Sequence, residues 1–238
     1  MNALDNLKVK IYADGADRDG MLEMYAKPYI QGFTTNPTLM KKAGITDYKA
    51  FAHEILQAIP DRPISFEVFA DEFIDMERQA LEIKTWGENV YVKIPVSNTR
   101  QEMAYDLIAR LSGAGVHLNV TAILTLEQVQ NVADALKDGP DSIVSVFAGR
   151  IADTGLDPVP VMQEALTILE LAPKAELLWA SPREALNIYQ ADNIGCHIIT
   201  ATNDLIRKLA LGGKDLAEYS LETVQMFYDD AQSAGYTL

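Results

Sequence analysis

Residues Asn89-Val90-Tyr91-Val92-Lys93-Ile94-Pro95-Val96 form a β-branched and aromatic run with one lysine in its middle. Such a run is typical of a strand, and a lysine inside it is expensive, because an ammonium loses several kcal/mol of hydration when it leaves water. Burial lowers the pKa of an amine from about 10.4 towards neutrality, and a neutral amine in a pocket attacks carbonyl compounds. An edge-strand lysine that extends to solvent is the alternative, and this strand alone does not decide between the two.

Similar apolar runs recur along the whole chain and alternate with helical patterns. We predict eight strands, near 8–14, 30–35, 63–68, 89–94, 116–121, 142–148, 176–180 and 195–200. A helical pattern follows each strand, at 16–27, 46–58, 71–86, 98–112, 125–138, 157–171, 182–191 and 202–210. Eight such units without a linker predict one domain over 1–238 of the α/β class, a (β/α)8 TIM barrel. A doubly wound open sheet is the alternative, but no glycine-rich phosphate fingerprint follows the first strand.

A ninth helical pattern covers about 215–233, beyond the eighth unit. Its apolar residues at helical spacing are Leu216, Tyr219, Val224, Phe227 and Ala231. We expect this C-terminal helix either to cap its own barrel or to pack on a neighbouring subunit.

The composition limits the partners of the chain. A net charge of −14 argues against nucleic acid and anionic membranes, whereas a few local arginines can still bind a small anionic substrate. Its one cysteine, Cys196, excludes an internal disulfide and fits a reducing compartment. The first residues show no signal-peptide pattern, and no apolar run approaches the about 18 residues of a membrane span. We therefore expect a cytoplasmic protein with small-molecule partners.

The strands of such a barrel carry their catalytic groups at their C-terminal ends, and residues two apart share a face. Seven consecutive predicted strands place candidate side chains there, most of them polar or charged. The candidates are Asp14, Thr34, Asn36, Glu67, Lys93, Asn119, Thr121, Ser145, Phe147, Arg150, Ser181 and Arg183. One polar strand end has an ordinary structural explanation, but each unpaired, desolvated polar group costs about 1–3 kcal/mol. Seven together indicate a functional site.

This set of side chains favours one chemistry. Lys93 can attack a carbonyl group, and Asp14 and Glu67 can divide the acid–base work. The asparagine amides suit sugar hydroxyls, and Arg150 and Arg183 suit a phosphate because guanidinium binds it bidentately. A single cysteine and no histidine cluster predict no metal site, and we expect no cofactor. The residues together suggest aldol-type chemistry on a sugar phosphate.

Five segments then resemble the transaldolase / fructose-6-phosphate aldolase family. They are Gly32-Phe33-Thr34-Thr35-Asn36-Pro37-Thr38, Val92-Lys93-Ile94-Pro95-Val96, Asn119-Val120-Thr121, Ser145-Val146-Phe147-Ala148-Gly149-Arg150-Ile151-Ala152-Asp153 and Ala180-Ser181-Pro182-Arg183. The similarity covers nearly the whole chain in the right order. The resemblance implies a (β/α)8 barrel, a metal-free Schiff-base mechanism and a homo-oligomer, a pentamer or a decamer.

The same resemblance implies a role for each candidate. Lys93 looks like the Schiff-base lysine, and Asp14 like the base that takes the C4 hydroxyl proton during C–C cleavage. Glu67 and Thr121 look like the pair that holds the catalytic water. The substrate-binding residues would be Thr34, Asn36, Asn119, Ser145, Phe147, Arg150, Ser181 and Arg183, with Arg150, Ser181 and Arg183 at a phosphate.

Two of these positions separate the branches of the family. The aldolase branch typically carries glutamine in place of Glu67 and tyrosine in place of Phe147, so this pair looks like the transferase side. We therefore expect a transaldolase that moves a dihydroxyacetone unit from fructose 6-phosphate or sedoheptulose 7-phosphate to an aldose phosphate, as in the pentose phosphate pathway. A dihydroxyacetone-releasing aldolase and a non-catalytic sugar-phosphate-binding barrel are the alternatives.

Overall fold

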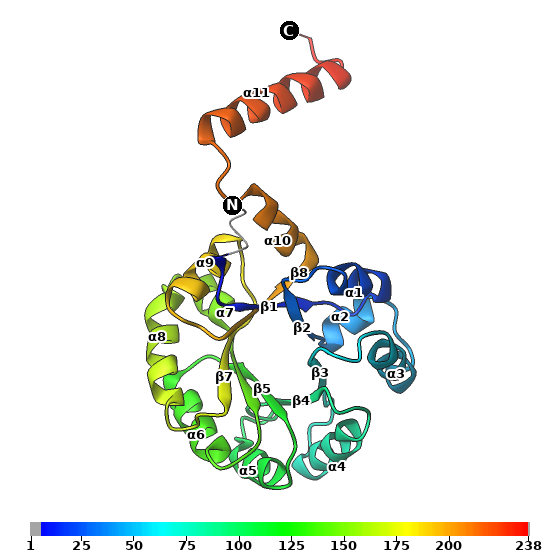
Figure 1. Cartoon of the computed structure of the whole chain (residues 1–238), viewed down its shortest axis with the longest axis vertical. Helices are drawn as coiled ribbons and strands as arrows, with labels where there is room; N and C mark the ends of the chain where they lie inside the picture. The colour runs from blue at the N-terminus through cyan, green and yellow to red at the C-terminus, as the bar shows by residue number, and fades with distance from the viewer. Residues whose placement is uncertain (1–5, 238) are drawn as a thin grey trace.

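Eight parallel strands close into one barrel in chain order, in a computed structural model that describes residues 6–237. The strands are β1 (Lys10–Asp14), β2 (Ile30–Thr34), β3 (Ile64–Glu67), β4 (Val90–Pro95), β5 (Leu118–Ile123), β6 (Ser142–Val146), β7 (Ala175–Trp179) and β8 (Ile198–Thr202). Helices surround them (Figure 1): α1 (Arg18–Tyr25), α2 (Pro37–Lys42), α3 (Tyr48–Ala58), α4 (Phe73–Lys84), α5 (Tyr105–Gly113), α6 (Leu126–Leu136), α7 (Ala148–Asp153), α8 (Pro158–Leu169), α9 (Leu186–Asn193), α10 (Asn203–Arg207), the 3-10 turn η2 (Lys208–Leu211) and α11 (Leu216–Ser233). The predicted α/β fold, a (β/α)8 barrel with a C-terminal helix, is confirmed.

The main core lies between the strands and the helices, and a smaller cluster fills the barrel itself. The smaller cluster consists of Tyr12, Ile143, Leu178, Ala180 and Ile198, with Tyr91 and Phe147 packed on it. Gly32 makes room for one of these side chains, because a Cβ at Gly32 would lie 2.5 Å from the Tyr12 ring. The barrel interior is therefore packed, as in other barrels of this kind.

Several strands begin later than predicted, and two of them, β5 and β8, begin at residues 118 and 198 instead of 116 and 195. The backbone N–H groups of Val116 and Cys196 still bond to carbonyls of the preceding helices. Gly115 and Gly195 just before them adopt left-handed φ angles of 71° and 76°. These are the hydrogen bonds and backbone angles of glycine-ended helices, so Val116 and Cys196 belong to the helix ends.

The helix predicted over 98–112 begins at Tyr105 instead. The Asn98 side chain explains the difference, because its Oδ1 accepts hydrogen bonds of 3.0 Å from the backbone N–H groups of Arg100 and Glu102. An asparagine that bonds local backbone in this way competes with helix formation. The start of the predicted helix is a folded loop between β4 and α5.

The C-terminal helix α11 extends away from the barrel, as Figure 1 shows at its red end. None of its residues is buried. The alternative in which this helix caps its own barrel is therefore wrong. Among the described helices, this one included, none is both long enough and apolar enough to cross a membrane.

Candidate active site

A cavity of about 680 Å³ opens where the strands end. All of the predicted site residues except Asn119 line it. Strand pairing brings them together, because Asp14 at the end of β1 is in register with Thr34 on β2, and Glu67 on β3 with Lys93 on β4. Further residues that were not predicted from the sequence also line the cavity: Pro37, Thr38, Leu39, Ala122, Leu124, Ala180 and Thr200.

Lys93 is buried inside the barrel, with 7% of its surface exposed. Its Nζ lies 3.1 Å from Glu67 Oε2 and donates a 3.1 Å hydrogen bond to the Thr35 carbonyl oxygen. An ammonium has three N–H donors, so these two contacts leave one for the cavity that Lys93 lines. The alternative of an edge-strand lysine in solvent is wrong, because a closed barrel has no edge strand.

Asp14 faces the same cavity from the end of β1. Its Oδ1 accepts a 2.8 Å hydrogen bond from Thr34 Oγ1. Burial raises the pKa of the Asp14 carboxyl, while the Lys93 charge and the Thr34 hydrogen bond act in the opposite direction. A raised pKa makes this carboxylate a better proton acceptor than an exposed aspartate.

Asn119 lies beneath the cavity and is fully buried. Its Nδ2 donates to Ser65 Oγ at 2.9 Å, and its Oδ1 accepts from Ser145 Oγ at 2.7 Å. Asn119 therefore holds Ser145, which does line the cavity. Thr121 on the same strand is different, since its Oγ1 is buried and has no hydrogen-bond partner among residues 6–237. Thr121 as a residue lines the cavity.

Asn36 enters the cavity from the start of α2, a short helix that was not predicted from the sequence. Its Oδ1 caps this helix by accepting a 2.9 Å hydrogen bond from the backbone N–H of Leu39. Pro37 follows at the first helical position, so Asn36-Pro37 is a typical helix start that could have been recognised. The cap fixes the Asn36 side chain at the cavity wall and leaves its amide N–H groups for a ligand.

Two arginines line the other side of the cavity. Arg183 donates from Nε to Asp153 Oδ1 at 2.9 Å and from Nη2 to Asp153 Oδ2. This pair raises the pKa of Arg183 and lowers that of Asp153. The Arg150 guanidinium lies 5.4 Å from the centroid of the Phe147 ring. Two guanidiniums and one carboxylate leave net positive charge here, which suits an anion such as phosphate.

Gly149 is packed directly against the loop that carries Ser181. A Cβ at Gly149 would lie 1.5 Å from the Ser181 carbonyl oxygen, and Ser181 itself has a left-handed φ of 61°. We expect Gly149→Ala to displace this loop, lower the free energy of unfolding by about 1–3 kcal/mol and weaken binding of inorganic phosphate. Chemical denaturation and titration calorimetry measure the two effects.

Gly113→Ala is the matched control, because a Cβ at Gly113 meets no atom within 4 Å. It should leave the denaturation midpoint and the phosphate affinity near those of the parent protein. Equal behaviour of the two variants would contradict the packing role of Gly149.

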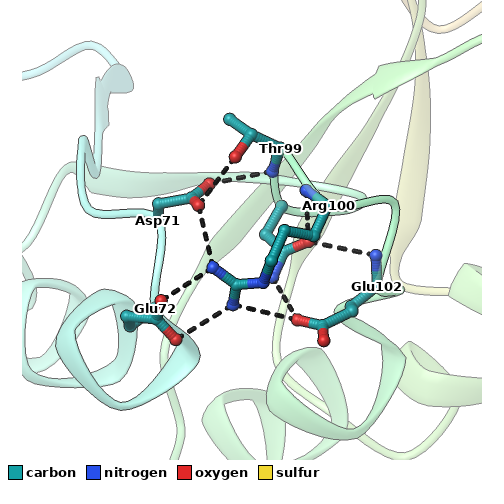
Figure 2. Close-up of polar contacts among 6 residues, drawn as sticks. Asp71, Glu72, Thr99, Arg100 and Glu102 are labelled. Carbon is teal, nitrogen blue, oxygen red and sulfur yellow. Dashed lines mark hydrogen bonds and ion pairs between the residues drawn. The ribbon is translucent and has the colours of Figure 1, made fainter.

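An ion-pair network joins the loops that follow β3 and β4, the strands of Glu67 and Lys93 (Figure 2). The Arg100 guanidinium lies between acidic groups from both loops, with N–O distances of 2.7 Å to Glu72, 3.0 Å to Glu102 and 3.4 Å to Asp71. Asp71 also accepts hydrogen bonds from the backbone N–H and the hydroxyl of Thr99, at 2.8 and 2.7 Å. An exposed pair alone contributes about 0–1 kcal/mol, but a network of several charges holds loops more firmly.

A closed (β/α)8 barrel with a lysine, two carboxylates and two arginines around one cavity is the arrangement of a barrel enzyme. Solved structures share the fold at low sequence identity. KGPDC from Streptococcus mutans superposes with a TM-score of 0.55 at 10% identity, over 82% of this chain and 88% of that one. A monomeric dihydrodipicolinate synthase variant gives 0.62 at 9% identity, over 94% and 79%. These two structures support the fold alone.

Sequence comparison identifies the family. The family model described as "Transaldolase/Fructose-6-phosphate aldolase" matches residues 11–238, so the chain belongs to this family and is an enzyme of the transaldolase/aldolase type. A "Probable transaldolase" of Dehalococcoides mccartyi is 31% identical over 202 residues, which are 84% of this chain and 90% of that protein. Another from Methanococcus maripaludis is 33% identical over 84% of this chain and 89% of the relative. A third, from Streptococcus agalactiae, is 32% identical over 81% and 85%.

Proposed function

We propose that this chain is a transaldolase, which transfers a dihydroxyacetone unit from a ketose phosphate to an aldose phosphate through a Schiff base on Lys93. The observation that carries the proposal is the buried Lys93 amine, 3.1 Å from Glu67 and in one cavity with Asp14. Family membership supports it, and so do the names of the relatives. The carboxyl pair and the two arginines supply the acid–base groups and the anion site that this reaction needs.

In the proposed reaction Lys93 passes a proton to Glu67, its ion-pair partner, and the amine then attacks the C2 carbonyl of the ketose phosphate. Glu67 shuttles protons so that the carbinolamine oxygen leaves as water, and the Thr121 hydroxyl holds that water. Asp14 then takes the proton of the C4 hydroxyl while the C3–C4 bond breaks. The bonding electrons move into the iminium on Lys93 and form an enamine, and the shortened aldose phosphate leaves.

The enamine then attacks the aldehyde carbon of the acceptor, and the aldehyde oxygen takes the proton back from Asp14. Water hydrolyses the new iminium, which returns the Lys93 amine and releases the new ketose phosphate. Transfer, and not release, requires that the enamine carbon is not protonated first. Phe147 lines the cavity without a hydroxyl group, and this favours transfer.

The assay that tests the function mixes the protein with fructose 6-phosphate, with and without erythrose 4-phosphate. We expect sedoheptulose 7-phosphate only when the acceptor is present. Without it, glyceraldehyde 3-phosphate should stop at about one equivalent per active site, with little free dihydroxyacetone. Free dihydroxyacetone without an acceptor would identify the aldolase alternative. Binding of fructose 6-phosphate without turnover would identify a non-catalytic barrel.

We also propose that α11 packs on a neighbouring copy in a homo-oligomer, a pentamer or a decamer. The support is its exposed apolar side chains, among them Val224 and Phe227, which find no partner in their own barrel as far as residues 6–237 describe it. Val224→Asp with Phe227→Asp should convert the oligomer to a smaller species in size-exclusion chromatography with light scattering. Gln225→Asp, on the same helix, is the control for an added charge and should keep the oligomer. A parent protein that is monomeric would contradict this proposal.

A further inference from the structure

We propose that Thr200 is a positioning residue for Asp14 and acts through Thr34 by two consecutive hydrogen bonds. The inference rests on the proposed function, in which Asp14 is the base. Thr34 Oγ1 lies 2.8 Å from Asp14 Oδ1 and 2.5 Å from Thr200 Oγ1. Thr200 lines the cavity and is 6% exposed.

The number of hydroxyl protons decides which group donates in each of the two hydrogen bonds. A threonine hydroxyl has one proton and accepts through its lone pairs. When Asp14 is ionised, the Thr34 proton is donated to the carboxylate, so the proton in the second bond must come from Thr200. The order is then Thr200 to Thr34 to Asp14, and the hydroxyl of Thr200 strengthens the hydrogen bond that stabilises the carboxylate.

The same two hydroxyls also serve the protonated state of Asp14. A protonated carboxyl can donate to Thr34 Oγ1, and Thr34 can then donate to Thr200 Oγ1. The hydrogen bonds reverse without moving a heavy atom. Asp14 therefore keeps a hydrogen-bond partner before and after it takes the substrate proton, which fixes its position through both halves of the reaction.

The fold creates this arrangement because β2 and β8 both flank β1. Asp14 is in register with Thr34 on one side, and Tyr12 with Thr200 on the other. The two threonine side chains meet inside the barrel, where the Tyr12 ring lies against Gly32.

The charges around Asp14 come from other strands. Neither β2 nor β8 contains a titratable residue, and β1 contributes Tyr12 and Lys10 at lower levels of the barrel. The charged group that acts on Asp14 is Lys93 from β4, with Glu67 from β3 paired to it. A change at Thr200 thus removes a hydrogen bond without removing a charge.

The test is the pH profile of kcat/KM for transfer by Thr200→Val, whose side chain has nearly the same shape but no hydroxyl. We expect kcat to fall about 3- to 10-fold. The acid limb of the kcat/KM profile should move about half a pH unit higher, because the Asp14 carboxylate is less stabilised once Thr200 no longer donates a hydrogen bond to Thr34. Thr200→Ser keeps the hydroxyl and should restore both values to within about twofold. Thr202→Val is the matched control on the exposed end of the same strand, and it should change neither.

A second measurement asks whether Thr200 acts through Thr34. In a Thr34→Val background the further change Thr200→Val should have little effect, since the connection to Asp14 is already broken. If Thr200→Val does not fold, Thr200→Ala serves in the same pair of measurements. The proposal is overturned if the acid limb of the kcat/KM profile does not move in Thr200→Val. It is also overturned if the effects of Thr200→Val and Thr34→Val on kcat/KM are fully additive. Borohydride trapping on Lys93 distinguishes failure of the proposed function from failure of the role of Thr200. If Lys93 is trapped but the acid limb of the Thr200→Val profile does not move, only the role of Thr200 is refuted.

Discussion

Replacing Lys93 with methionine is expected to lower transfer of the dihydroxyacetone unit by a factor of about 10⁴ or more, because the variant has no amine to form the Schiff base. Methionine fills nearly the same length of buried, unbranched side chain, so the barrel should still fold. The measurement is the initial rate of sedoheptulose 7-phosphate formation, with far-ultraviolet circular dichroism as the check on folding. Sodium borohydride and fructose 6-phosphate should add a three-carbon unit to Lys93 in the parent protein and none in the variant.

Lys10→Met is the matched control for the loss of a barrel lysine. Lys10 lies on β1 and pairs with Glu176 at 2.7 Å, outside the cavity. We expect this variant to keep its activity to within a few fold and to accept the borohydride label on Lys93. A label on another residue of the parent protein, or an active Lys93→Met protein, would end the assignment of the nucleophile.

The sequence was sufficient to predict which side chains gather at the strand ends, because a closed parallel barrel places all of these ends at one rim. Once β3 and β4 are adjacent and parallel, both strand ends meet at the same rim of the barrel, and their register places Glu67 beside Lys93. How deep a side chain lies inside the barrel is harder to predict from the sequence. Asn119 has the same alternation as Thr121, but two serine contacts hold it beneath the cavity, and those contacts depend on neighbouring strands.

Other features were missed for separate physical reasons. Thr200 ends the predicted eighth run, 195–200, so the rule for polar strand ends applies to it as it does to the other seven strands. The loop before Tyr105 falls within the helical pattern of 98–112, but the local hydrogen bonds of Asn98 decide its structure. The direction of α11 could not be predicted, since an amphipathic pattern shows that a face needs a partner and not which partner it has.

Asp14→Asn is expected to lower kcat about 10²- to 10⁴-fold while the covalent adduct on Lys93 still forms. The asparagine carbonyl oxygen can accept the hydrogen bond from Thr34, so the local geometry is kept, but an amide cannot take the C4 hydroxyl proton. Schiff-base formation depends on Lys93, Glu67 and Thr121 in the proposed mechanism and needs no help from Asp14. Quenched-flow borohydride trapping should therefore capture the intact six-carbon donor on Lys93 in this variant.

The role of Asp14 as the base also predicts the direction in which the pH profile of kcat/KM is shifted. The base acts in its ionised form, and burial raises the pKa of Asp14, so the acid limb of kcat/KM in the parent protein should lie above the pH at which an exposed aspartate, with a pKa of about 3.9, would place it. Asp14→Asn should lose this limb together with the activity. Asp19→Asn removes an exposed carboxylate from α1 and should change neither. An Asp14→Asn protein that cleaves fructose 6-phosphate at the parent rate would show that another group takes the C4 proton, and Glu67, already beside the amine, would be the next carboxylate to test.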